Sequence, residues 1–403
     1  MKLIKGGVCA PIGFKAAGIH CGIRPGKTKK DLALIVSEVP ASAAAVYTKN
    51  FVKGAPIYVT MENLKNGTAS AVICNSGIAN TCNADGIQKA QEMCKIAAEA
   101  LKIPADDIIV ASTGVIGQPL NIKPIKAGMP ELANALSYEG GHDAVEAIMT
   151  TDTFPKEVAV SVNIDGNDVK IGGTAKGSGM INPDMATMLS FLTTDAKIEP
   201  KLLSKLIKTA ADVSFNRVSI DGDTSTNDML SIMANGKSGI LIEEGTEGFG
   251  KFAEALTAVC TALSKMLAKD GEGATKLIEC IVTGAPDKIS AQRVSDSVIN
   301  SSLVKAAMFG EDANWGRILC AIGYSGAALD VSLIDVSFKS EPGEILLCKN
   351  GAGVDFSEEY ALEILKRDEI IVDIKLNQGN FCSTSWGCDL SYDYVKINGD
   401  YRT

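Results

Sequence analysis

Gly173–Asp195 reads GTAKGSGMINPDMATMLSFLTTD, and this stretch joins a glycine-rich loop to an apolar strand. The loop contains Gly177, Gly179 and one cation, Lys176, while residues 188–192 (MLSFL) are apolar enough to predict a buried strand. Because glycine reaches backbone angles closed to other residues, such a loop can hold a peptide bond in a bent, strained conformation. Thr187 stands between the loop and the strand, so we expect its hydroxyl at the edge of rigid core.

This position suits an internal acyl transfer. The Thr187 oxygen would attack the carbonyl of Ala186, and hydrolysis of the resulting ester would leave Thr187 as a new N-terminus. Its free α-amino group, with a reference pKa of about 7.7–8.0, would then be a general base beside its own hydroxyl. The alternative is structural, because most threonines in apolar runs are strand formers whose hydroxyl bonds a nearby carbonyl. The local pattern leaves both open.

Eight blocks of sequence resemble one family, in that family's order. Together they are similar to the ornithine acetyltransferases, the bifunctional glutamate N-acetyltransferases of arginine biosynthesis. Two departures are Cys9, where a threonine is usual, and Asn83-Ala84 in place of Thr-Gly. The blocks are Val8–Phe14, Asn75–Asn80, Ser112–Gly117, Met149–Thr153, Lys176–Leu189, Asp221–Asp228, Gly310–Arg317 and Asn398–Thr403.

The resemblance implies an α/β fold of the self-cleaving, N-terminal-nucleophile type. Its four layers form an α/β/β/α sandwich, with the catalytic threonine at the head of a strand between the sheets. Cleavage between Ala186 and Thr187 would give an alpha chain of residues 1–186 and a beta chain of residues 187–403. An α2β2 heterotetramer in the cytoplasm is the expected assembly.

The implied reaction is a ping-pong acetyl transfer. N-acetylornithine would acetylate the Thr187 oxygen, ornithine would leave, and glutamate would take the acetyl group; some family members also accept acetyl-CoA as donor. No cofactor and no metal are expected. By resemblance, Thr113 and Gly114 form the oxyanion hole that stabilises the tetrahedral intermediate. The substrate-binding residues implied are Thr151, Lys176, Thr187, Glu272, Asn398 and Thr403, with Thr150 as the alternative to Thr151.

Taken without the resemblance, each of these residues has an ordinary structural interpretation. Residues 110–114 are a strand running into a turn, and a lone lysine is usually solvated. Glu272 would be a surface loop charge, and the last six residues would be a frayed end. The resemblance instead predicts an ordered C-terminal tail that reaches the site.

Composition limits the class of protein. The 403 residues exceed the size at which one hydrophobic core stops growing, so two lobes are expected. A net charge of −9 disfavours a nucleic-acid partner, and no apolar run reaches the ~18 residues of a membrane span. The first residues lack the apolar region of a secretory signal, which predicts a cytoplasmic protein. Two histidines offer little for a zinc site, and eleven cysteines without a CxxC pair predict free thiols.

Short apolar strands alternate with amphipathic helices along the chain. Strands are predicted at residues 32–36, 108–110 and 371–376, and helices at residues 87–101, 202–213 and 252–268. This pattern fits a layered α/β sandwich and a doubly wound sheet equally well.

Two other functions compete with the transferase. An N-terminal-nucleophile aminopeptidase of the β-aminopeptidase group would share the fold and self-cleavage but hydrolyse its substrate. A small-ligand binding module would keep Thr187 structural and leave the chain uncut. The acetylated transferase must be discharged by glutamate much faster than by water, which distinguishes it from the aminopeptidase. A denaturing gel distinguishes it from the binding module, whose chain would stay uncut.

Overall fold

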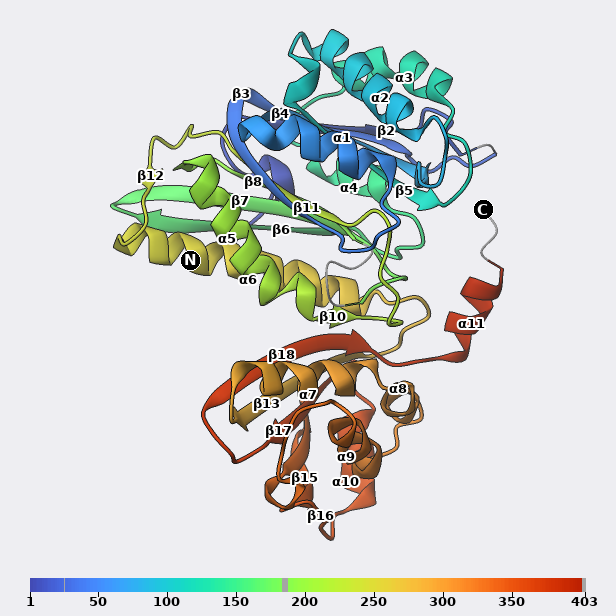
Figure 1. Ribbon diagram of the computed structural model, residues 1–403, viewed down its shortest axis with the longest axis vertical. Coiled ribbons are helices and arrows are strands. Elements are labelled where there is room, and N and C mark those ends of the chain that lie inside the picture. Colours follow the sequence, from blue (N-terminus) through green and yellow to red (C-terminus); the bar gives the residue numbers. More distant parts are fainter. Residues whose placement is uncertain (25, 183–187, 401–403) are drawn as a thin grey trace.

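The computed structural model describes residues 1–24, 26–182 and 188–400. A large lobe containing a nine-stranded sheet lies above a smaller lobe built on a seven-stranded sheet (Figure 1). The two predicted lobes are therefore present. Within the described ranges, no helix combines the length and apolar character needed to cross a membrane.

The nine-stranded sheet is folded over on itself, and β3 is the strand that turns the corner. The first part of β3 pairs with β2 and β4, while its last part, residues 42–47, pairs with β11. The register with β4 shifts between Val36 and Ala41, around Pro40, which cannot donate to the ladder. The strand order is β1-β6-β7-β8-β11-β3-β4-β5, with β2 beside β3. The strands are β1 (Lys2–Ile4), β2 (Phe14–Ile19), β3 (Leu32–Tyr47), β4 (Thr68–Ile78), β5 (Ile108–Val115), β6 (Lys156–Ile164), β7 (Asn167–Lys176), β8 (Leu189–Thr194) and β11 (Met229–Ala234).

Three separate cores show that this lobe has four layers. Successive side chains of a strand point to opposite faces. In β8, Phe191 enters a central core that it shares with Cys74 of β4, so the two halves of the sheet face each other. Leu192 points the other way, into a core with α5 and α6. Ile73 of β4 likewise points outward, into a core with α2 and α3. The predicted α/β/β/α sandwich is confirmed.

Helices form the outer layers of the sandwich. α1, α2 and α3 cover the half containing β3, β4 and β5, and α5 and α6 cover the half containing β6, β7 and β8 (Figure 1). α4 closes one end of the central core against β2 and β3. The helices are α1 (Ala55–Asn63), α2 (Gly86–Leu101), α3 (Ile122–Asn134), α4 (Gly141–Ile148), α5 (Pro200–Asp212) and α6 (Glu247–Lys269); the small pair is β9 (Lys197–Ile198) with β12 (Leu241–Ile242).

The second lobe packs its own sheet between α6 and a set of later helices. Its strand order is β10-β18-β13-β17-β14-β15-β16, and α7 to α10 share its main core. Leu277 and Trp386 face the other way and join the core around α6, which ties the two lobes together. The elements are β10 (Val218–Ser219), β13 (Leu277–Ala285), α7 (Lys288–Asn300), α8 (Ser302–Phe309), α9 (Trp315–Gly323), β14 (Asp335–Ser340), β15 (Gly343–Lys349), β16 (Ala352–Gly353), α10 (Glu358–Leu365), β17 (Glu369–Lys375), β18 (Phe381–Cys388) and α11 (Tyr392–Gly399).

The predicted chain boundary between residues 186 and 187 does not separate the two lobes. It lies outside the described residues, in the part of the chain that joins β7 to β8. β7 and β8 are antiparallel neighbours from the pair Lys176–Leu189 to the pair Ile171–Thr194. Two chains divided at this boundary would therefore share one sheet.

Candidate active site

The sequence-predicted site residues that the structure describes line one cavity of about 280 Å³. This cavity lies where β5 and β7 end, between the sandwich, the segment after α6 and α11. Ala186, Thr187 and Thr403 lie outside the described residues. The predicted residues that line the cavity are Thr113, Gly114, Thr151, Lys176, Glu272 and Asn398.

β5 delivers Thr113 and Gly114 to the cavity at a place where only glycine fits. Gly114 has a φ of 128°, a backbone conformation that favours glycine, and it pairs with Gly77 of the parallel strand β4. A Cβ at Gly114 would lie 2.2 Å from the carbonyl carbon of Gly77. The Thr113 side chain is nearly buried and lines the cavity. Thr113 thus brings a hydroxyl to the cavity and Gly114 a backbone N–H, and an oxyanion hole is built from donors of these kinds.

Lys176, the last residue of β7, brings a buried cation to the same place. Its ammonium donates to the hydroxyl of Thr150 at 2.9 Å and lies 3.3 Å from that of Thr113. Thr151 turns the other way and bonds Ser178, with 2.7 Å between the two hydroxyl oxygens. Both Thr150 and Thr151 line the cavity, and each hydroxyl has a protein partner, so the choice between them as substrate contact stays open.

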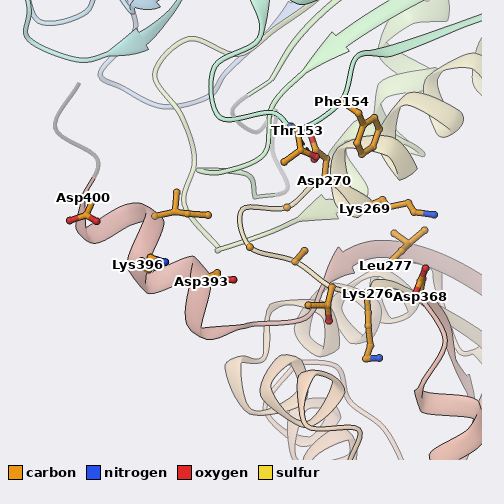
Figure 2. A pocket seen from close by; sticks show the side chains of 15 residues that line it. Thr153, Phe154, Lys269, Asp270, Lys276, Leu277, Asp368, Asp393, Lys396 and Asp400 are labelled. Atoms are coloured by element: carbon orange, nitrogen blue, oxygen red, sulfur yellow. Dashed lines mark hydrogen bonds between the residues drawn. The ribbon is translucent and has the colours of Figure 1, made fainter.

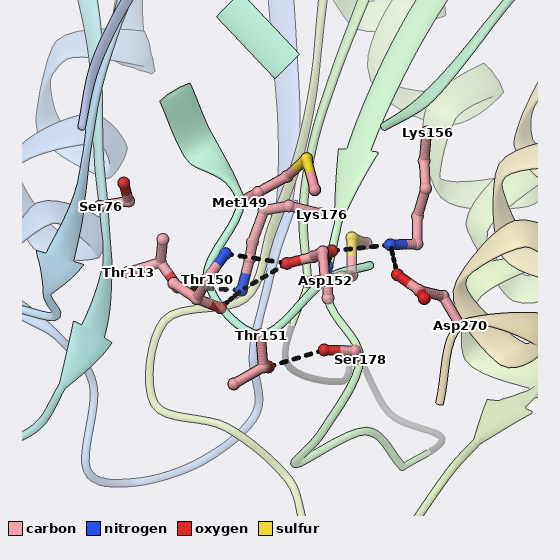
Figure 3. Close-up of polar contacts among 12 residues, drawn as sticks. Ser76, Thr113, Met149, Thr150, Thr151, Asp152, Lys156, Lys176, Ser178 and Asp270 are labelled. Atoms are coloured by element: carbon pink, nitrogen blue, oxygen red, sulfur yellow. Dashed lines mark hydrogen bonds and ion pairs between the residues drawn. The ribbon is translucent and has the colours of Figure 1, made fainter. Parts of the chain in front are cut away.

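Behind Lys176 lies a buried ion network, formed by Asp152, Lys156 and Asp270 (Figure 3). The Lys156 ammonium is 2.7 Å from Asp152 and 2.5 Å from Asp270, and all three side chains are almost completely buried. Asp152 also accepts hydrogen bonds from the backbone N–H groups of Thr150 and Gly177. Burial alone would raise the pKa of Asp152, but Lys176 and Lys156 together hold it below its usual value. Asp152 is therefore a fixed negative charge.

An acidic group faces the cavity from its other wall. Glu272 follows α6, and its backbone N–H donates to the carbonyl of Ser178 at 2.7 Å. Its carboxylate accepts from the Asn398 side chain at 2.8 Å, which ties the last turn of α11 to the site. The carboxylate lies so close to Gly179 that a Cβ there would be 2.4 Å from one of its oxygens. The cavity thus has a cation and a carboxylate in its lining, and both are held by the fold.

Asp228 fixes the head of β8 next to the predicted cleavage site. Its carboxylate accepts the backbone N–H of Met188 at 2.9 Å, and the Met188 carbonyl accepts the N–H of Met229 at 3.1 Å. The second carboxylate oxygen has no hydrogen-bond partner within the described part of the chain. Complete burial raises the pKa of Asp228 well above its usual value. The residue after Thr187 is thus held by a buried acid.

The sequence alone predicts no role for Asp152, Asp228 or Asn227, although all three lie in the segments Met149–Thr153 and Asp221–Asp228 that resemble the family. Asn227 lines the cavity and donates to the backbone carbonyls of Ala79 and Ser112, so it joins β4 and β5 behind Thr113. The signal available in the sequence was that Asp152 stands between Thr151 and Thr153, and that Asn227 and Asp228 follow Thr226 directly before the apolar residues of β11. Local sequence does not tell a buried acid from a solvated turn.

A larger hollow of about 550 Å³ lies beside the candidate site but is lined by other residues (Figure 2). It lies between the segment after α6 and α11, and shares Asp270 with the buried ion network. Its charged lining groups have both signs and include Lys269, Lys276 and Asp393.

The described residues offer neither a metal site nor a disulfide. Among them, no group of three His, Cys, Asp or Glu side chains could hold a metal ion. All eleven cysteines are described, and each is a free thiol.

Known proteins similar to this chain cover its whole length. The model of the ArgJ family matches residues 15–403. The arginine biosynthesis bifunctional protein ArgJ of Caldanaerobacter subterraneus subsp. tengcongensis is 50% identical over 405 residues, with 100% of each chain covered. The Bacillus subtilis protein of the same name is 47% identical, over 99% of this chain and 97% of its own. A crystal structure of the Bacillus halodurans ArgJ protein is 44% identical, with a TM-score of 0.51, and covers 53% of this chain and 100% of its own. In agreement with the resemblance to the ornithine acetyltransferases, the chain belongs to the ArgJ family.

Proposed function

We propose that this chain transfers an acetyl group from N-acetylornithine to glutamate and so serves arginine biosynthesis. The observation that carries this function is the single cavity lined by Thr113, Gly114, Lys176 and Glu272, beside the head of β8. The relatives that are about half identical over the whole chain are named for arginine biosynthesis. This evidence favours the transferase over an aminopeptidase.

The proposed chemistry runs through an acetyl ester on Thr187. Its oxygen attacks the acetyl carbonyl of N-acetylornithine while its α-amino group accepts the proton. The hydroxyl of Thr113 and the N–H of Gly114 stabilise the oxyanion, and ornithine leaves with the proton. Glutamate then attacks the ester through its amino group, which regenerates Thr187 and releases N-acetylglutamate. A cavity of about 280 Å³ suits one amino-acid substrate at a time, as a ping-pong order requires.

The two charges of the cavity provide the selectivity. Lys176 attracts the carboxylate that donor and acceptor share, and Glu272 attracts the amine of ornithine. Asn398, bonded to Glu272 at 2.8 Å, holds that carboxylate toward the site. Thr151 and Thr403 complete the proposed substrate contacts.

We also propose that the chain cuts itself between Ala186 and Thr187. The cut would divide the sandwich, but the β7–β8 ladder would keep the products, residues 1–186 and 187–403, in one sheet. The Bacillus halodurans chain supports two products: its full length corresponds to 53% of this chain, about 214 residues, close to the 217 residues from Thr187 to Thr403. Two such pairs would form the α2β2 enzyme of the cytoplasm.

A denaturing gel with intact mass measurement tests the processing. Wild-type protein should give chains of residues 1–186 and 187–403, and Thr187→Ala should remain one chain. Thr187→Ser and Thr187→Cys should cleave at least in part, because each keeps a nucleophile. An uncut chain in active wild-type enzyme would refute the mechanism.

The acceptor decides between transferase and aminopeptidase. Enzyme acetylated with N-acetylornithine should lose its acetyl group much faster to glutamate than to water. Discharge by water at the same rate would favour the hydrolase.

A further inference from the structure

Lys176 contacts the oxyanion residue Thr113 directly, and the direction of that contact is fixed. An ammonium group has three donors and no acceptor, so the oxygens of Thr113 and Thr150 must accept from it. The hydrogen of the Thr113 hydroxyl therefore points away from Lys176. Because Thr113 lines the cavity, its hydroxyl can donate this hydrogen to a group bound there.

A cation behind a hydroxyl also strengthens that hydroxyl as a donor. Hydrogen bonds in a chain polarise one another, and bonds from an ionised donor are about twice as strong as neutral ones. We propose that Lys176 acts through Thr113, by orienting and polarising the oxyanion donor, and that Asp152 is the positioning residue that holds Lys176 there. This role deepens the proposed acetyl transfer and rests on it. It adds to the attraction of a substrate carboxylate, for which the third ammonium hydrogen remains.

Asp152 contacts both Lys176 and the backbone on either side of the Lys176–Thr150 hydrogen bond. Its carboxylate lies 4.0 Å from the Lys176 ammonium and accepts from the N–H of Thr150 and of Gly177. It thereby fixes the backbone of Gly177, which follows Lys176, and of Thr150, whose hydroxyl accepts from Lys176. Lys156 holds the far side of the same carboxylate at 2.7 Å. Few rearrangements are open to Lys176 while Asp152 is in place.

Asp152 also keeps Lys176 charged. Burial lowers the pKa of Lys176, and the negative charge of Asp152 is the main effect that opposes this. Without Asp152, the pKa of Lys176 should fall further, and the neutral amine would cease to polarise Thr113. The other groups that face Lys176 are the cations Lys156 and Arg24, the thiol of Cys74, and the buried acid Asp228.

A double-mutant cycle tests whether Lys176 works through Thr113. We would measure kcat per processed enzyme, and the rate of self-cleavage, for Lys176→Met, Thr113→Val and the double variant. Lys176→Met should cost a large part of the ~10²–10³-fold that one oxyanion donor supplies, and should cost little more in the Thr113→Val background. Losses in kcat that simply multiply, or a Lys176→Met variant that changes only KM, would overturn the proposal.

The pH profile gives a second readout that does not depend on Lys176 variants. Asp152→Asn should move the high-pH limb of kcat to lower pH. The matched control is Asp195→Asn, since Asp195 is also buried and accepts two backbone N–H groups, but at the far end of β8. If the high-pH limb of kcat stays at the wild-type pH in Asp152→Asn, or if it shifts equally in Asp195→Asn, the role of Asp152 is contradicted. Wild-type enzyme without acetyl transfer would refute the proposed function itself, whereas a multiplicative cycle in active enzyme refutes only this inference.

Discussion

Replacing Lys156 by methionine should destabilise the fold far more than loss of a surface lysine. Lys156 is completely buried between Asp152 and Asp270, and methionine leaves both carboxylates without their shared cation. Breaking a buried ion pair from one side costs about 3–5 kcal/mol. Lys176 still lies 4.0 Å from Asp152, so we expect the lower end of this range, about 3 kcal/mol. At about 2.1 cal/mol/K per residue the chain has an unfolding entropy of about 0.85 kcal/mol/K, so Tm should fall by about 3–4 °C.

Calorimetry and urea unfolding of purified variants would measure this loss. Lys205→Met is the control, because Lys205 pairs with Glu244 at 3.3 Å on the surface and should be nearly dispensable. Lys156→Met combined with Asp270→Asn should be less destabilised than Lys156→Met alone, since one uncompensated charge is gone. Equal stability of Lys156→Met and Lys205→Met would refute the assignment of a buried network.

The same loss should depend on pH with a defined sign. The pKa of Asp152 in the folded protein lies below its usual value of 3.8, so its ion pairs stabilise the fold fully above that pH. This contribution disappears as the pH falls through the depressed pKa. The difference between wild type and Lys156→Met should therefore be largest near neutral pH and shrink in acid. A difference that grows in acid would contradict the argument.

Two further changes probe the walls of the cavity. Gly114→Ala should lower kcat by ~10²–10³-fold, the loss expected for one oxyanion donor, because its Cβ would clash with Gly77. Gly117→Ala is the control, with a positive φ of 82° but nothing within 4 Å, and it should keep its activity. Deleting residues 398–403 should leave folding and self-cleavage intact but raise KM for ornithine donors and glutamate, because Asn398 no longer holds Glu272. Wild-type kinetics in the truncated enzyme would remove Asn398 and Thr403 from the site.

The course of β3 explains why the layers could not be read from the sequence alone. The apolar run at residues 32–36 predicts only the first part of this strand, yet β3 continues to Tyr47 through the alanine-rich residues 41–45. Alanine is a poor strand former, and here pairing with β11 and packing in the central core override that preference. The fold-over at Pro40 depends on these long-range contacts. Periodicity alone therefore fitted a doubly wound sheet equally well.

The site shows the same division between local and long-range information. The glycine at position 114 follows from its backbone angle, and the expected cavity residues do meet. The roles of these cavity residues were inferred from the family resemblance. No local sequence pattern predicts that a lysine at the end of a strand, such as Lys176, is buried. The sequence does not predict the roles of Asp152 and Asp228, because each carboxylate anchors a backbone N–H group that lies 25 or 40 residues away along the chain.

The register of β7 and β8 would let the chain keep its site after the proposed self-cleavage. Lys176, the last residue of β7, pairs with Leu189, the first residue of β8. The end of β7 and the start of β8 therefore lie side by side. The connection between them carries the proposed cut, and cutting a connection removes no hydrogen bond of the ladder. Asp228 holds Met188 on one side of the cut, and Asp152 holds Gly177 near the other. Both anchors are buried acids bonded to backbone N–H groups, and neither bond involves the peptide bond that would be cut. Cleavage between residues 186 and 187 would then leave the anchored residues Met188 and Gly177, and the contact of Lys176 with Thr113, in place.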